Sequence, residues 1–83
     1  MKDVKWSPLK SKRLKRTRGV SFEEIIHAEL LGIRAHPSRD NQQILIFYYK
    51  RHVWVVPFVI EGEGIFLKTL YQSRKYQKLY KKG

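Results

Sequence analysis

QILIFYYKRHVWVVPFVIEGEGIFLKTLY, residues 43–71, is the stretch that decides the fold. Three short runs in it are rich in β-branched and aromatic residues, and they are separated by Arg51-His52 and by EGEG at 61–64. Such runs are typical of strands, and glycine supplies the positive φ that tight hairpin turns require. We therefore expect an antiparallel meander of three strands, over residues 43–50, 53–60 and 65–71.

The apolar runs are nearly continuous, so both faces of this sheet should be at least partly covered by helices. Pro57 lies inside the second run and has no N–H to donate, which predicts an edge or a bulge at that point. The preceding segment 34–42, RAHPSRDNQ, is rich in turn-forming residues and predicts a loop.

A core helix is predicted over residues 21–32, SFEEIIHAELLG. Ser21 and Glu24 form a capping box, and Gly32 follows the end of the helix. One apolar stripe with helical spacing runs through and just beyond it, formed by Phe22, Ile25, Ile26, Leu30 and Ile33. His27 falls on the other side and is interpreted as a half-exposed surface histidine.

Two basic helices are expected to flank these elements. Ser7, Pro8 and Gly19 mark the beginning and end of a first helix over 7–19. A short last helix is expected after Ser73, and its basic side carries Arg74, Lys75, Lys78, Lys81 and Lys82. The 83 residues have room for one domain, so we predict a single α+β domain over 1–83 with the order helix, helix, strand, strand, strand, helix.

The basic residues are concentrated at the two ends of the chain. Fourteen of the eighteen Lys and Arg residues lie in 1–18 and 68–83, which contain only one acid, Asp3. The net charge of +11 therefore indicates a polyanionic partner. RNA or DNA comes first, because phosphate contacts release condensed counterions. An acidic protein or an anionic membrane surface would use the same charge.

Several other classes are excluded or disfavoured. The chain has no cysteine, so disulfides and cysteine-based zinc sites are impossible. The longest apolar run, 53–60, is far shorter than the roughly 18 residues of a membrane span, and residues 1–6 lack a signal-peptide core. The three histidines are dispersed, and no metal or phosphate-loop motif occurs. We expect a soluble cytoplasmic protein without metal or cofactor.

Basic and tyrosine side chains alternate near the C-terminus, as in proteins that bind unpaired bases and phosphates. RNA carries its own nucleophile, the 2′-OH, so a basic site needs only to align it, move protons and stabilise charge. Tyr76 and Tyr80 are expected to pack the last helix rather than to stack on bases. The predicted RNA-binding residues are Lys12, Lys15, Arg16, Arg18, Tyr71, Lys75 and Lys78.

Several segments resemble the BrnT-like toxins of bacterial type II toxin-antitoxin systems. They are WSPLKSKRLKRTRGVSFEE at 6–24, VWVVPFV at 53–59, IFLKT at 65–69 and SRK at 73–75. GVSFEE is the most specific piece and SRK the next, and the similarity spans nearly the whole chain. The chain departs from the family at Thr17-Arg18-Gly19, where the family usually has Lys-His-Gly.

The resemblance implies a RelE-like fold and a ribonuclease that an antitoxin neutralises. By matching position, Arg74 corresponds to the family's motif arginine, and Trp6, Phe22 and Glu24 to structural positions. On this reading Lys68, Arg74 and Lys75 bind and stabilise the scissile phosphate of mRNA, with or without the ribosome. Either His36 or His52 is the proton-transfer residue, since histidine titrates near neutral pH.

Two other functions fit the same composition. A non-catalytic nucleic-acid-binding module would bind with strong salt dependence and never cut. A basic protein that binds only an acidic protein would lose its affinity for nucleic acid near physiological salt. The resemblance favours the ribonuclease toxin.

Overall fold

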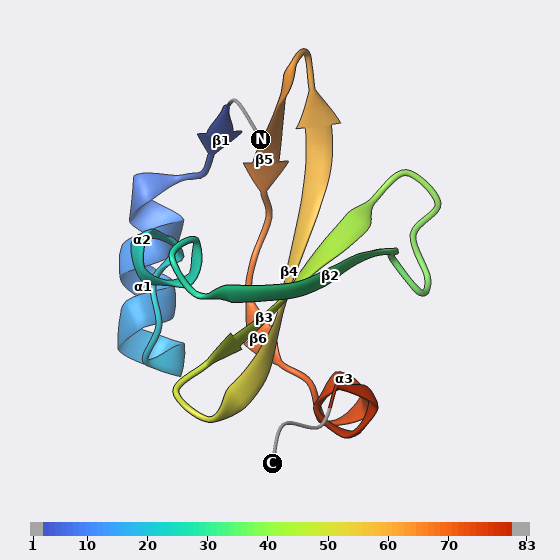
Figure 1. Ribbon diagram of the computed structural model, residues 1–83. Coiled ribbons are helices and arrows are strands. Elements are labelled where there is room, and N and C mark those ends of the chain that lie inside the picture. The colour runs from blue at the N-terminus through green and yellow to red at the C-terminus, as the bar shows by residue number, and fades with distance from the viewer. Residues whose placement is uncertain (1–2, 81–83) are drawn as a thin grey trace.

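The computed structural model describes residues 3–80 as three helices on one six-stranded sheet (Figure 1). The helices are α1 (Pro8–Arg18), α2 (Phe22–Ile25) and α3 (Arg74–Leu79). The strands are β1 (Val4–Lys5), β2 (Glu29–Ala35), β3 (Gln43–Tyr49), β4 (His52–Glu61), β5 (Gly64–Leu67) and β6 (Tyr71–Gln72). The sheet order is β1-β5-β4-β3-β2, with β6 also paired to β4. The α+β class is confirmed, whereas the prediction of only three strands is wrong.

The predicted central hairpin is present as β3 and β4, which pair from Gln43 with Phe58 to Tyr49 with His52. Its turn consists of Lys50 and Arg51, whose φ angles are 51° and 66°. Two-residue hairpin turns with positive φ at both positions match the twist of the strands, and they favour Asn-Gly. Here two basic residues adopt positive φ, where the clash of the Cβ with the backbone destabilises the folded state.

Arg51→Gly is therefore expected to stabilise the protein, because glycine adopts positive φ without steric cost. Arg51 is exposed, so the change removes little packing. Arg51→Ala is the matched control, since it removes the same charge but keeps the Cβ. Urea unfolding should show the glycine variant about 1 kcal/mol more stable than the alanine variant. Equal midpoints for the two variants would contradict the turn geometry.

The second predicted hairpin is also present, with Glu61 paired to Gly64 and Gly62 at a φ of 59°. Beside it lies β1, a strand that the sequence did not predict. Val4 pairs in parallel with Ile65, and the Ile65 N–H donates to the Asp3 carbonyl over 2.8 Å. A Cβ at Gly64 would lie 2.5 Å from that carbonyl oxygen. The glycine therefore allows the N-terminal strand to approach.

Pro57 lies where the neighbours of β4 change from β5 to β6. Phe58 pairs with Leu67 and Val55 with Tyr71, and between these pairs the Pro57 carbonyl accepts from Lys68 N over 2.8 Å. The nitrogen and the carbonyl of one strand residue point to the same side. The missing N–H therefore faces this interruption of the ladder, in line with the predicted edge or bulge.

The predicted helix over 21–32 is wrong beyond its first turn. Only Phe22–Ile25 is helical, and β2 begins at Glu29, so the predicted loop over 34–42 starts two residues later, after Ala35. Leu30 pairs with Phe47 and Ile33 with Leu45, because a bulge adds one residue to β2. The bulge puts residues three apart on the same face of the strand. This spacing is indistinguishable from that of a helix in the sequence.

The two flanking helices are confirmed. Ser7 caps α1 by accepting from Lys10 N over 3.2 Å, and Gly19 ends it at a φ of 83°. Ser73 caps α3 by accepting from Tyr76 N over 3.2 Å. The predicted last helix extended over Lys81 and Lys82, which lie outside the described residues.

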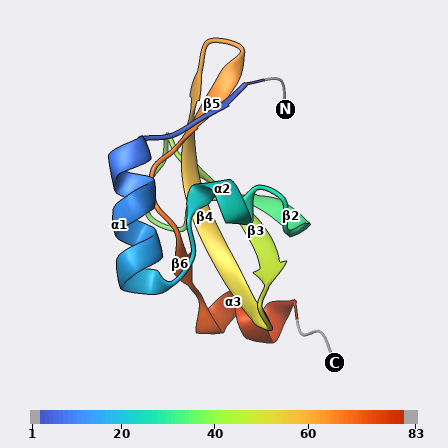
Figure 2. The ribbon, with the colours of Figure 1, turned by 90° about the vertical axis from the view of Figure 1, so that its left-hand side faces the viewer.

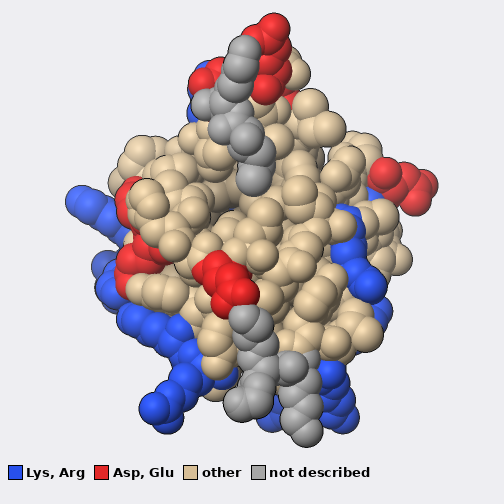
Figure 3. Space-filling model, in the orientation of Figure 1, with Lys and Arg blue, Asp and Glu red and all other residues tan. Residues whose placement is uncertain are grey.

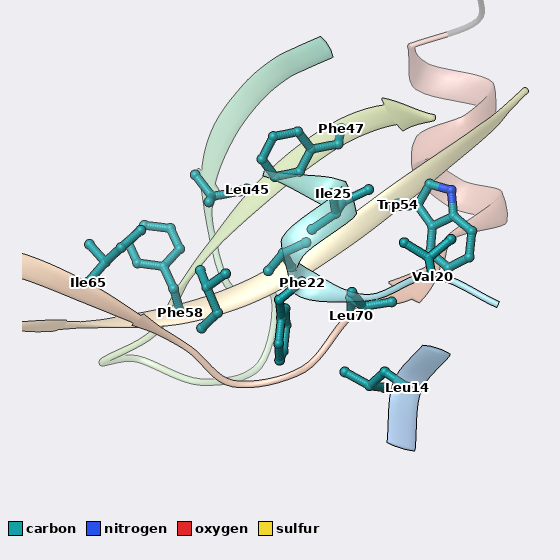
Figure 4. Close-up of a cluster of buried hydrophobic side chains, with 12 residues drawn as sticks. Leu14, Val20, Phe22, Ile25, Leu45, Phe47, Trp54, Phe58, Ile65 and Leu70 are labelled. Carbon is teal, nitrogen blue, oxygen red and sulfur yellow. The ribbon is translucent and has the colours of Figure 1, made fainter. Parts of the chain in front are cut away.

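The sheet buries apolar side chains on both faces. One face packs under α1 and α2, and its central members are labelled in Figure 4; they are Leu14, Val20, Phe22, Ile25, Leu45, Phe47, Trp54, Phe58, Ile65 and Leu70. On the other face Tyr76 of α3 packs against Ile44, Ile46, Val53 and Val55. Figures 1 and 2 both place α3 at the lower end of the sheet. Coverage of both faces explains the nearly continuous apolar runs of β3 and β4.

The Ser21–Glu24 segment joins α1 to the sheet. Ser21 and Glu24 form the predicted capping box. Glu23 accepts from the Ser11 hydroxyl and from Trp6 Nε1, the latter over 2.9 Å. Phe22 is fully buried, and its ring centroid lies 6.1 Å from that of Trp6. The segment that resembles the toxin family most specifically is therefore used for folding.

Candidate nucleic-acid interface

Three hollows follow one another along residues 68–74, which connect β5 to α3. The first, of about 440 Å³, lies between α1, this connection and the 36–42 loop, and it includes Tyr71. The second, of about 430 Å³, shares Tyr71 and lies against the end of α1. The third, of about 370 Å³, shares Gln72 with the second and lies at the start of α3. Figure 2 shows the connection between β5 and β6 passing beside α1.

The residues that line these hollows, which we call the basic track, include no Asp or Glu. Its basic and histidine members are Lys10, Arg18, His36, Arg39, His52, Lys68 and Arg74. Within residues 3–80 both ion pairs go to Glu24, from Lys15 and from Lys50, and neither lysine is on the track. The charge of the track is therefore not neutralised by carboxylates of the described chain.

The first hollow presents hydrogen-bond donors. Ser38 N–H donates to His36 Nδ1 over 3.1 Å, so the neutral His36 ring carries its proton on Nε2. Burial, and then the nearby Tyr76, raises the pKa of the Tyr71 phenol above its usual 10, against the opposing effect of Arg18. Tyr71 is therefore protonated at neutral pH. Both groups can donate to an anion, and neither is placed to accept a proton.

The second hollow is fixed by hydrogen bonds to the backbone. Arg18 Nη1 donates to the Leu70 carbonyl over 2.8 Å, which ties the end of α1 to the connection. Trp54 Nε1 donates to the Tyr49 carbonyl over 3.0 Å, and only 2% of Trp54 is exposed. Trp54 is therefore part of the core and not a stacking surface, whereas Arg18 still has further N–H groups to offer.

The third hollow brings together Arg74 and His52. Gln77 Oε1 accepts from Val53 N over 2.7 Å, and Ser73 caps α3, so both side chains are already bonded. Within residues 3–80 the ring of His52 has no hydrogen-bond partner, and both His52 and Arg74 are exposed. Neither ring nitrogen of His52 is therefore engaged by a residue of 3–80. The structure distinguishes the two candidate histidines, which the sequence could not do.

Six of the eleven predicted site residues line the basic track, but they are distributed over its three hollows. Lys68 and His36 lie in the first hollow, whereas Arg74 and His52 lie in the third. Tyr71 and Arg18 line the second. The predicted catalytic set is therefore split into two pairs.

The other five predicted residues do not line the track. Lys15 donates to Glu24 over 2.7 Å and to the Gly19 carbonyl over 3.3 Å, so it makes a structural contact away from the track. Lys12 and Arg16 are on the exposed side of α1, and Lys78 is exposed on α3. Lys75 Nζ lies 5.3 Å from the ring centroid of Tyr76.

Two basic members of the track were missed as site residues. Lys10 lies on a helix with many basic residues, and the sequence does not show which of them face the track. Arg39 lies in a loop, where no periodic pattern indicates the direction of a side chain. The packing prediction for Tyr76 is confirmed, since only 6% of it is exposed. Tyr80 packs beside it, and the Arg34 guanidinium lies over both rings, at 5.8 and 5.7 Å.

None of the family models, curated proteins or solved structures compared with this chain matches it. The resemblance to BrnT-like toxins therefore stays a prediction. Among the described residues, no helix combines the length and apolarity needed to cross a membrane.

Proposed function

We propose that this protein is a metal-independent endoribonuclease that acts on mRNA as the toxin of a toxin-antitoxin pair. The observation that supports this most is the third hollow, where the free ring of His52 and the guanidinium of Arg74 open onto a basic track without carboxylates. The resemblance to BrnT-like toxins points the same way. An enzyme that acts on mRNA would work in the cytoplasm.

In the proposed reaction His52 accepts the proton of a ribose 2′-OH. The 2′-oxygen attacks the adjacent phosphorus, and Arg74 donates to the phosphate oxygens as their negative charge grows. The bond from phosphorus to the 5′-oxygen then breaks, and the 5′-oxygen takes a proton from water. The products are a 2′,3′-cyclic phosphate and a 5′-hydroxyl. The other basic residues of the track hold the flanking phosphates.

End-labelled single-stranded RNA tests this proposal directly. We expect cuts that persist in EDTA and products that end in a cyclic phosphate. If free RNA is bound and not cut, the same assay in a translating extract decides whether the ribosome is required. Absence of cutting in both settings would contradict the enzymatic proposal.

RNA binding is expected to weaken steeply with salt. The five Lys and Arg residues of the track predict a slope of log K against log salt of roughly −3.5 for a single strand. The dissociation constant should then rise about 100-fold between 50 and 200 mM salt. Lys68→Ala should flatten the slope by about 0.7, measured by fluorescence anisotropy. A slope near zero would exclude binding through phosphates.

A non-catalytic RNA-binding module is the second candidate. It is favoured by the first hollow, where the predicted catalytic residues Lys68 and His36 are joined by a second lysine, an arginine and a protonated tyrosine. These groups can hold phosphates, and none is placed to remove a proton. A third candidate, a protein that binds only an acidic protein, predicts no RNA binding near physiological salt.

The antitoxin is the proposed protein partner, and β2 is the surface that suits it. Within the described chain β2 pairs only with β3, and Leu30 and Ile33 on it are 43% and 52% exposed. Figure 3, in the orientation of Figure 1, shows mostly uncharged residues on this face, with one acidic group near its centre and both basic and acidic groups at its margins. The last strand of a sheet, when it carries exposed apolar side chains, is a site at which another protein can add a strand.

A further inference from the structure

The first hollow concentrates positive charge from three separate parts of the chain. Lys10 comes from α1, Arg39 from the 36–42 loop and Lys68 from the connection after β5. No carboxylate of residues 3–80 forms an ion pair with any of the three. The volume of about 440 Å³ falls within the range of small-ligand pockets, roughly 300–1,000 Å³. Three cations around one hollow repel one another unless an anion binds between them.

This hollow also lies at one end of the basic track. On one side it continues through Tyr71 into the second hollow. On the other side the loop turns from Arg39 to Asp40, and Asp40 lines a separate hollow with Asn41 and Phe58. A carboxylate repels phosphates, so an RNA backbone that follows the track meets an unfavourable charge beyond Arg39. The first hollow therefore suits the end of an RNA strand better than an internal part of one.

The first hollow offers more positive charges and hydrogen-bond donors than an internal phosphate of an RNA strand can use. Such a phosphate carries one negative charge, whereas a terminal phosphate monoester carries about −1.5 to −2 and offers three acceptor oxygens. Lys10, Arg39 and Lys68 supply three positive charges, and His36 Nε2 and the Tyr71 hydroxyl add two neutral donors.

We propose that the first hollow binds the terminal phosphate monoester of an RNA strand. This inference rests on the proposed binding of RNA along the track. It assigns Lys10, Arg39 and Lys68 to recognition of an RNA end, and it leaves the reaction to Arg74 and His52. A protein with this site prefers RNA that ends in a phosphate over RNA that ends in a hydroxyl.

Three 2′-O-methyl RNA oligonucleotides of one sequence test the proposal, because they lack the 2′-hydroxyl and cannot be cut. One ends in a 5′-phosphate, one in a 3′-phosphate and one has hydroxyls at both ends, and each carries the same internal fluorophore. Anisotropy titrations at 150 mM salt should give about tenfold tighter binding for one phosphorylated oligonucleotide. Which of the two binds tighter gives the direction in which RNA lies along the track.

Matched variants locate the effect. Lys10→Ala and Lys68→Ala should each remove most of the preference, whereas Lys12→Ala, the same change on the exposed side of α1, should keep it. Thermal unfolding checks that the variants are folded. Equal affinities for the three oligonucleotides, or a preference that survives in the Lys10→Ala, Lys68→Ala double variant, would overturn the proposal. If the folded protein binds none of the three, the proposed RNA binding fails as well.

Discussion

Arg74→Ala is expected to slow RNA cleavage by about 100-fold to 1,000-fold, because an arginine aimed at a phosphate acts mainly on the charge that develops in the transition state. Arg74 is exposed at the first position of α3 and makes no ion pair within residues 3–80, so its removal should leave the fold intact. The measurement is the cleavage rate under single-turnover conditions with saturating protein, beside a thermal unfolding curve. A folded variant that cuts at the parent's rate would exclude Arg74 from the reaction.

His52→Gln should slow the same step by about 100-fold to 10,000-fold, the usual contribution of general acid-base catalysis. The matched control is His36→Gln, which removes an equivalent ring from the donor-rich first hollow. It should weaken RNA binding and leave the rate at saturation nearly unchanged. The opposite pattern would move proton transfer to His36 and overturn the assignment made from the hydrogen bond between Ser38 and His36.

The pH profile separates a proton-transfer role from a structural one. If His52 accepts the 2′-OH proton, the rate at saturation depends on pH, and this dependence disappears in His52→Gln. Arg74→Ala should lower the rate at every pH and keep the shape of the curve, because the proposed role of Arg74 is to stabilise charge and not to transfer a proton. Loss of the pH dependence in both variants would contradict separate roles for His52 and Arg74.

The fold could be predicted from the sequence where a local rule decides the structure. The caps at Ser7, Ser21 and Ser73 and the EGEG turn satisfy backbone groups with nearby residues, so short patterns are sufficient. β2 could not be predicted in this way. Its residues pair with β3 across a bulge, and a bulged strand with apolar residues three apart resembles one side of a helix.

The candidate site was predictable in composition but not in arrangement. The charge map identified Arg18, Lys68 and Arg74, because a cluster of cations without acids is visible in the sequence. Which cations form ion pairs depends on carboxylates that are distant in the sequence, as the contact between Lys15 and Glu24 shows. The split between His36 and His52 arises from long-range topology, since β6 and the 36–42 loop place them in different hollows.

Glu24→Gln is expected to make the protein less stable at pH 7 by about 2 kcal/mol and to reduce its sensitivity to acid. The hydrogen bond from Lys15, supported by those from Tyr49 and Ser21, lowers the pKa of Glu24 from its usual 4.5 to about 2 against the effect of burial. That difference corresponds to at most about 3.4 kcal/mol, and solvent at a side chain that is 25% exposed reduces it.

The pH window follows from the direction of this change. Because the folded-state pKa lies below the unfolded one, the contribution of Glu24 is complete above about pH 4.5 and is lost as the pH falls toward 2. Urea unfolding at a series of pH values should therefore show a shallower loss of stability in Glu24→Gln across this window. Glu23, whose pKa is lowered mainly by the Ser11 hydroxyl, contributes to the slope that remains.

Lys15→Gln and Lys12→Gln distinguish the effect of the ion pair between Lys15 and Glu24 from the effect of the net positive charge of α1. Both remove one cation from α1, but only Lys15 touches Glu24, at 2.7 Å. Lys15→Gln should reproduce much of the effect of Glu24→Gln, because the main cause of the lowered pKa is gone. Lys12→Gln should change the acid profile little. If the two lysine variants behave alike, the net positive charge of the helix, rather than the ion pair that links α1 to the capping box of α2, sets the acid stability of the fold.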